Sequence, residues 1–145
     1  MKLRYTLPAI VWTIAVLLAS SDFFSATHTG SWLRGIFEHL LGQTLPSPQI
    51  DWLNFLWRKS AHCIAYGILS ALWFRALRAD AKERWVAQWA WTAILIAAAV
   101  AVTDEIHQSF VPSRSGSPYD VMLDTTSAAL VQGLIRAAQV LIFRA

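Results

Sequence analysis

The stretch WVAQWAWTAILIAAAVAVTDEI, residues 85–106, decides the fold class of this chain. It contains no charged residue before Asp104 and Glu105. A helix needs about 20 predominantly apolar residues to cross the hydrocarbon core of a bilayer. The stretch therefore predicts a membrane-spanning helix that ends in an acidic pair.

Three further apolar stretches have a similar length, at about residues 7–24, 55–77 and 121–143. Hydrophobic residues make up 56% of the 145 residues and charged residues 14%, and the mean hydropathy is +0.43. Soluble domains are about 45–50% apolar and about 25% charged. We therefore expect an all-α protein, an integral membrane four-helix bundle, with residues 1–145 forming one domain.

The first apolar stretch has a second interpretation as a signal peptide. Lys2 and Arg4 form a basic start, and the small residues Ala19, Ser20 and Ser21 resemble a cleavage region. Removal would leave three spans and would place the C-terminus, with its basic residues, on the outer side. Retention as a true span is favoured because basic residues near span ends stay in the cytoplasm.

The positions of the charged residues predict the orientation. With a cytoplasmic N-terminus, eight of the twelve basic residues lie inside with two of the nine acidic residues, which gives +6. Four basic and seven acidic residues then lie outside, which gives −3. This predicts a multi-pass protein with both termini cytoplasmic. The net charge of +3 follows from this topology, and no nucleic-acid partner is needed to explain it.

The outer loop between the first two spans contains a segment with helical periodicity. Its apolar residues fall on one face, and they are Trp32, Leu33, Ile36, Phe37, Leu40 and Leu41. Arg34, Glu38 and His39 lie toward the other face, with Ser31 as a candidate N-cap and Gly42 as a stop. We expect an amphipathic helix on the outer leaflet, followed by an extended connector over residues 44–48.

A polar stripe opens the second span. Arg58, His62 and Tyr66 follow one another at intervals of four residues, and Lys59 precedes His62 by three, so all four can share one helix face. Basic residues at a span end can also extend only to lipid headgroups. His62 and Tyr66 lie one and two turns deeper and require buried partners.

Acidic groups meet this stripe from the other two spans. Asp104, His107 and Gln108 can share a face of the third span, with Glu105 beside it. Asp120 and Asp124 stand one turn apart at the head of the fourth span. The intervening loop holds Arg114 among several proline and glycine residues, which favour a rigid turn. We expect the three polar sets to meet at the outer boundary of the membrane.

These motifs closely resemble the VanZ-like family. The resemblance lies in RKSAHCIAY (residues 58–66), in DEIHQSFVPSRSG (residues 104–116) and in Asp120 and Asp124. It implies a small multi-helix protein of the bacterial cytoplasmic (inner) membrane, with a role in the cell envelope. The namesake of the family contributes to teicoplanin resistance, so the resemblance also suggests a link to antibiotic resistance.

The chain departs from the family pattern just after the last aspartate. Family members often have glycine there, where this chain has Thr125, Thr126 and Ser127. This difference affects how closely neighbouring helices pack. Ala129 and Gly133 still offer small residues one turn apart.

Several chemistries fit the predicted site. Four carboxylates with two histidines can hold a divalent cation, although the spacing matches no zinc motif and we assign no metal ligand. Cations among carboxylates also suit a phosphate-bearing membrane lipid or cell-wall precursor. A third reading is a network of ion pairs that only fastens the helices, as in an accessory or structural protein. Transport is disfavoured because the centres of the spans contain almost no polar residues and the sequence has no internal repeat.

The charge of the cluster favours an anionic ligand over a metal. The cluster has a net charge of −1 when its histidines are neutral, because it holds four acidic and three basic residues. The acidic residues are Asp104, Glu105, Asp120 and Asp124, and the basic residues are Arg58, Lys59 and Arg114. We expect Asp120 and Asp124 to orient Lys59 and Arg114 toward a phosphate or carboxylate. The candidates for catalysis are Glu105, His62 and Asp104. The candidates for ligand binding are Arg58, Lys59, Tyr66, His107, Gln108, Arg114, Asp120 and Asp124. Enzymatic activity and oligomeric state stay open.

Overall fold

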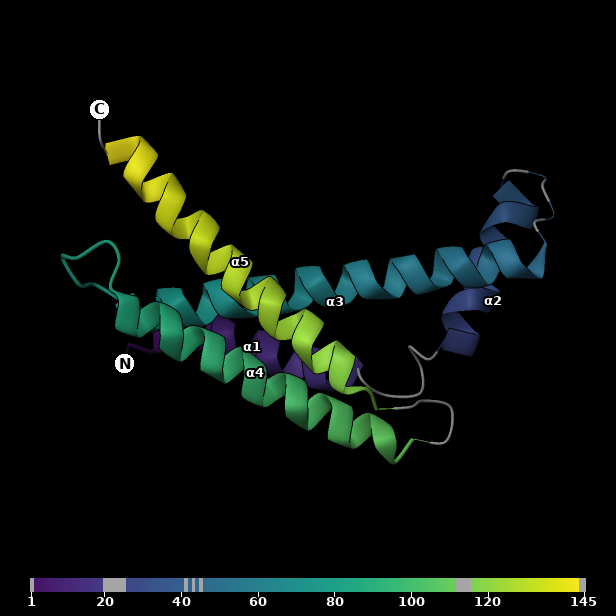
Figure 1. Ribbon diagram of the computed structural model, residues 1–145, viewed down its shortest axis with the longest axis horizontal. Helices are drawn as coiled ribbons and strands as arrows, with labels where there is room; N and C mark the ends of the chain where they lie inside the picture. The colour runs from purple at the N-terminus through teal and green to yellow at the C-terminus, as the bar shows by residue number, and fades with distance from the viewer. Residues whose placement is uncertain are drawn as a thin grey trace.

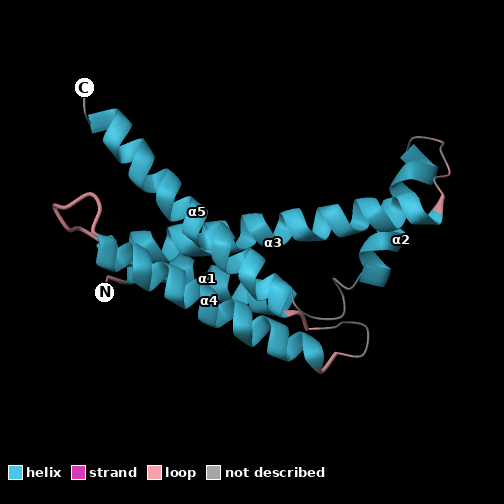
Figure 2. Cartoon of the chain, in the orientation of Figure 1, coloured by secondary structure: helices cyan, strands magenta, loops and turns pink. Residues whose placement is uncertain are grey.

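The structure is a computed structural model that describes residues 2–19, 26–40, 42, 44, 46–111 and 116–143. These residues form five α-helices and no strand (Figures 1 and 2). The helices are α1 (Leu3–Ala19), α2 (Ala26–Leu40), α3 (Ser47–Arg78), α4 (Ala87–Ser109) and α5 (Pro118–Phe143). The prediction of an all-α chain is confirmed.

The long helix α3 organises the molecule. It contacts each of the other four helices, and Figure 1 shows α2 at one end of α3 and the chain termini toward the other. With a rise of about 1.5 Å per residue, its 32 residues exceed the ~30 Å thickness of a hydrocarbon core. The helix begins at Ser47, before the start of the predicted span of 55–77.

Two predicted boundaries before α3 were wrong. The expected connector over residues 44–48 already becomes helical at Ser47, because Pro48 occupies the first turn, where a missing N–H costs no helical hydrogen bond. The amphipathic helix begins at Ala26 and not near Ser31, so Ser31 is not its N-cap. Gly42 adopts a φ of 62°, which agrees with its predicted role as a stop.

The other predicted spans correspond to helices with similar bounds. Helix α4 runs three residues further than predicted, to Ser109, and α5 begins at Pro118 in place of residue 121. Residues 20–24 of the first predicted span lie outside the described part of the chain. Two helices, Ala87–Ser109 and Pro118–Ile142, are long and apolar enough to cross a membrane. Helix α1 is apolar but shorter, and α3 is long but carries the polar stripe.

Small residues let the helices approach closely. Buried alanines repeat along one face of α4 at Ala90, Ala93, Ala97 and Ala101. A Cβ atom at Gly67 of α3 would lie 2.9 Å from a methyl group of Val131 on α5. Such small contact residues are typical of helix pairs in membranes, where close packing stabilises association.

The two longest apolar helices bury polar residues and expose apolar ones. In α5 the buried side chains include Asp124, Ser127 and Gln132, whereas Met122, Leu130, Leu134, Leu141 and Ile142 are exposed. In α4 the buried set includes Asp104, Glu105 and Gln108, and Trp91, Leu95, Val102 and Ile106 are exposed. This distribution is the opposite of the one expected for a protein in water.

Asp80 joins α1 to the loop after α3. Its carboxylate accepts hydrogen bonds from Lys2, Tyr5 and Arg4, the last at 2.6 Å. The hydrogen bonds from Lys2 and Tyr5 lower the pKa of Asp80 below its ordinary value. The N-terminus of α1 and the C-terminus of α3 therefore lie together at the end of the molecule that is opposite to α2.

Candidate functional site

Side chains along one face of α3 meet acidic groups of α5. Lys59 Nζ forms an ion pair with Oδ1 of Asp120. One turn deeper, His62 Nδ1 lies 3.1 Å from Oδ2 of Asp124, which is fully buried. Lys59 and His62 are three residues apart on α3, and their partners Asp120 and Asp124 are four residues apart on α5. Each pair lies about one helical turn apart, so the two ion pairs can form side by side.

A second contact joins α3 to α4. The hydroxyl of Tyr66 donates to Oδ2 of Asp104 at 3.3 Å, and Nε2 of Gln108 donates to the same oxygen at 3.1 Å. The His62 and Tyr66 rings stack with centroids 6.2 Å apart. The polar stripe of α3 is therefore linked to both acidic helices.

Three carboxyl groups of this region are buried, with exposed fractions of 2% for Asp104, 6% for Glu105 and 0% for Asp124. Each keeps one side-chain oxygen that is buried and has no hydrogen-bond partner among the described residues. A buried acceptor without a partner costs roughly 1–3 kcal/mol. Such groups cluster at functional sites more often than in a purely structural core.

Glu105 faces the loop between α4 and α5. Its Oε2 accepts a hydrogen bond from the backbone N–H of Ser117 at 2.6 Å. A Cβ atom at Gly116 would collide with the backbone oxygen of Glu105, so the glycine allows this close approach. Glu105 therefore fixes the loop that leads into α5.

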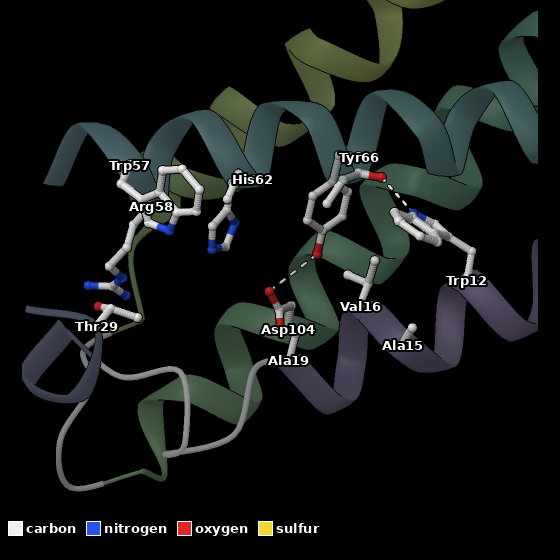
Figure 3. A pocket seen from close by; sticks show the side chains of 12 residues that line it. Trp12, Ala15, Val16, Ala19, Thr29, Trp57, Arg58, His62, Tyr66 and Asp104 are labelled. Atoms are coloured by element: carbon white, nitrogen blue, oxygen red, sulfur yellow. Dashed lines mark hydrogen bonds between the residues drawn. The ribbon is translucent and has the colours of Figure 1, made fainter. Parts of the chain in front are cut away.

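A cavity of about 350 Å³ lies between α1 and α3, next to the polar contacts (Figure 3). Most of its wall is apolar. Four polar side chains of the wall come from three helices, and they are Thr29, Arg58, His62 and Asp104. Tyr66 also lines the cavity, and Glu105 does not. Two of the three candidates for catalysis, His62 and Asp104, thus border the same space.

Arg58 differs from its basic neighbours. Lys59 and His62 are each paired with an aspartate, whereas no ion pair or hydrogen bond of Arg58 is found within the described residues. Its guanidinium points toward Thr29 of α2 at one end of the cavity (Figure 3). Arg58 is therefore a half-buried cation whose charge is not neutralised by a described neighbour.

The structure brings together most of the residues predicted from the sequence, with two exceptions. His107 is exposed, while Glu105, Asp104 and Gln108 are buried. The inward face of α4 therefore differs from the predicted one, because it includes Glu105 in place of His107. Arg114 lies outside the described part of the chain, and Asp124 pairs with His62.

The sequence did not predict how far the polar contacts continue. Ser70 Oγ donates to the backbone oxygen of Ala128 at 3.2 Å, and Nε2 of Gln132 donates to Ser70 Oγ at 2.7 Å. The signal was present, since Ser70 follows Tyr66 by four residues and Gln132 follows Asp124 by eight. Trp12 and Thr29, which also line the cavity, gave no such signal.

A metal ion has no evident set of ligands in the part of the chain that the structure describes. No group of three or more histidine, cysteine, aspartate or glutamate side chains there is placed to hold one. The orphan oxygens of Asp104, Glu105 and Asp124 therefore do not converge on one cation within these residues.

Comparison with known proteins identifies one family. The model of the family described as VanZ/LLP1 matches residues 5–142, which is nearly the whole chain. No curated protein and no solved structure matches the sequence.

Proposed function

The chain belongs to the VanZ/LLP1 family, and from this premise and the site we propose a membrane protein that binds the anionic headgroup of a cell-envelope lipid. The ligand is a membrane lipid or a lipid-linked cell-wall precursor. The proposed protein is a four-span bundle in the bacterial cytoplasmic membrane, with α2 on the outer leaflet and the site open to the outer side. A link to glycopeptide resistance belongs to the same proposal, through the envelope role suggested by the family.

The distribution of side chains supports membrane insertion. Helices α4 and α5 expose large apolar residues and bury carboxyl and amide groups. Exposed leucine and isoleucine side chains along a helix are unfavourable in water and favourable in lipid. Intramembrane acidic groups are costly unless they face the interior of the protein, which is where Asp104 and Asp124 lie.

The two ends of the molecule support the proposed orientation. Lys2, Arg4 and Asp80 meet at one end, and the guanidinium of Arg136 lies 4.8 Å from the Trp85 ring. This basic end corresponds to the cytoplasmic side by the positive-inside rule. The polar site and α2 then belong to the outer side.

The observation that carries the ligand class is Arg58 at the cavity, which has no ion-pair partner among the residues that the structure describes. Lys59 and His62 are already occupied by Asp120 and Asp124, so Arg58 supplies the cation for a ligand. A guanidinium binds phosphate with two parallel hydrogen bonds, which favours Arg over Lys at such a site. This assignment replaces our expectation that Lys59 is the cation that grips the anion.

Thermal unfolding in lipid nanodiscs tests the proposal. Phosphatidic acid in a phosphatidylcholine disc should raise the melting temperature of the unmodified protein, and EDTA should have little effect. Arg58→Gln should lose most of the shift, whereas Arg34→Gln, which alters an exposed arginine on α2, should keep it. Strong EDTA sensitivity that one metal reverses, without a lipid effect, would overturn the proposal in favour of a metal site.

The second candidate function is purely structural. It is favoured by the three contacts that tie α3 to α4 and α5, which involve Lys59, His62 and Tyr66. If the cluster only fastens the helices, His62→Ala should lower membrane abundance and melting temperature. Arg58→Gln should then change neither property, and anionic lipid should leave all variants unaffected.

A further inference from the structure

The cavity beside Arg58 has the form of a slot between α1 and α3. Ala15 and Ala19 of α1 line one side, and Ala61 and Ala65 of α3 line the other. Alanine side chains end at Cβ, so they leave space between helices that larger residues would fill. The volume of about 350 Å³ falls within the range of roughly 300–1,000 Å³ that is typical of ligand pockets.

The two ends of the slot differ in chemistry. Arg58 and Trp57 lie at one end, and Trp12 lies at the other (Figure 3). The indole N–H of Trp12 donates to the backbone oxygen of Ala65 at 2.9 Å, so this end has a satisfied polar group and presents no free donor. A ligand that fills the slot must therefore be anionic at the Arg58 end and apolar toward Trp12.

We infer that the slot holds one hydrocarbon chain of a lipid whose phosphate is bound by Arg58. The inference rests on the proposed function and adds the position of the chain. A free anion would occupy only the Arg58 end and would leave the apolar wall without a partner. An uncharged chain would leave the guanidinium unpaired. A molecule that combines both parts matches both the Arg58 end and the apolar wall.

The two parts of the ligand have different roles. A chain that moves from the bilayer into the slot exchanges one apolar environment for another, so its transfer contributes little affinity and packing decides its fit. The phosphate contributes the charge-assisted hydrogen bonds. The slot should therefore select the shape of the chain, and Arg58 should set the strength of binding. Both acyl and prenyl chains carry this chemistry when they end in a phosphate.

Photo-crosslinking in phosphatidylcholine nanodiscs tests the position of the chain. The probes are phosphatidic acid with a diazirine in one acyl chain, a prenyl phosphate with the same group, and a matched diacylglycerol without phosphate. On the unmodified protein, we expect adducts of a phosphate probe to concentrate on residues 12–19 and 61–66. The probe that labels this region more efficiently identifies the chain type. Ala15→Leu and Ala61→Leu should reduce these adducts several-fold, and Ala99→Leu, on α4 and outside the cavity lining, should not.

Two results would overturn this inference, and only the second would also count against the proposed function. Adducts spread evenly over exposed faces, such as Leu130 and Leu134 of α5, together with an intact Arg58-dependent thermal shift, would overturn the slot and leave the headgroup site standing. Adducts in the slot that are equal for diacylglycerol and persist in Arg58→Gln would place a chain there without its phosphate. That second result would contradict both the Arg58 anchor and the proposed function.

Discussion

At the scale of single residues, Gly67 sets how closely α3 approaches α5. A Cβ atom at this position would lie 2.9 Å from Val131, and overpacking a close contact typically costs about 1–3 kcal/mol. Gly67→Ala should therefore lower the melting temperature in nanodiscs. The control is Gly133→Ala on α5, where a Cβ atom would meet nothing within 4 Å. That change should be neutral or stabilising, because alanine favours helix by up to about 1 kcal/mol. Equal effects of the two changes would count against the close contact.

Residue patterns in the sequence predicted that the polar side chains of α3 face acidic groups, but they did not predict every individual pair. The stripe of Lys59, His62 and Tyr66 was evident from helical periodicity alone. Which residues of a polar segment turn inward depends on the rotation of the helix, and packing sets this rotation. Glu105 is buried and His107 exposed for that reason, and Lys59 is paired while Arg58 is not.

At the scale of elements, Asp80 fastens α1 to the loop between α3 and α4. Neighbouring Lys2 and Tyr5 lower its pKa, so the contribution of Asp80 to stability is fully present above the ordinary aspartate pKa of 3.8 and is lost as the pH falls through the lowered value. At neutral pH, Asp80→Asn should weaken the contact and speed hydrogen exchange in the first turns of α1. Glu83→Gln, in the same loop, is the control. Unchanged exchange in Asp80→Asn would show that other contacts hold α1.

Element positions were predictable where hydrophobic length alone defines a helix. The ranges of α4 and α5 lie within three residues of the expectation, because their apolar runs are bounded by charged or turn-forming residues. The beginning of α3 was missed, since Pro46 and Pro48 resemble an extended connector although proline is also favourable in a first helical turn.

At the scale of the whole molecule, basic residues and buried acidic residues lie toward opposite ends of the proposed membrane axis. The basic residues gather with both helix ends near Asp80, and the buried acids gather toward α2. Composition and charge predicted that basic residues and the acidic cluster lie at opposite ends of the molecule, and the orientation across a bilayer stays a prediction. The slot between α1 and α3 was not predictable, since alanines in a span give no signal of the space that they leave.

Cysteine labelling in intact cells tests the central claim, an outward-facing site, most directly. Single cysteines at Ser113 and Ala81 in a Cys63→Ala background fall in two different predicted loops, which the proposed topology assigns to opposite sides of the membrane. An impermeant thiol reagent should label the cysteine at position 113 in intact cells, and the cysteine at position 81 only after the membrane is opened. Labelling at position 81 in intact cells, with protection at position 113, would contradict the account, because the site would then face the cytoplasm.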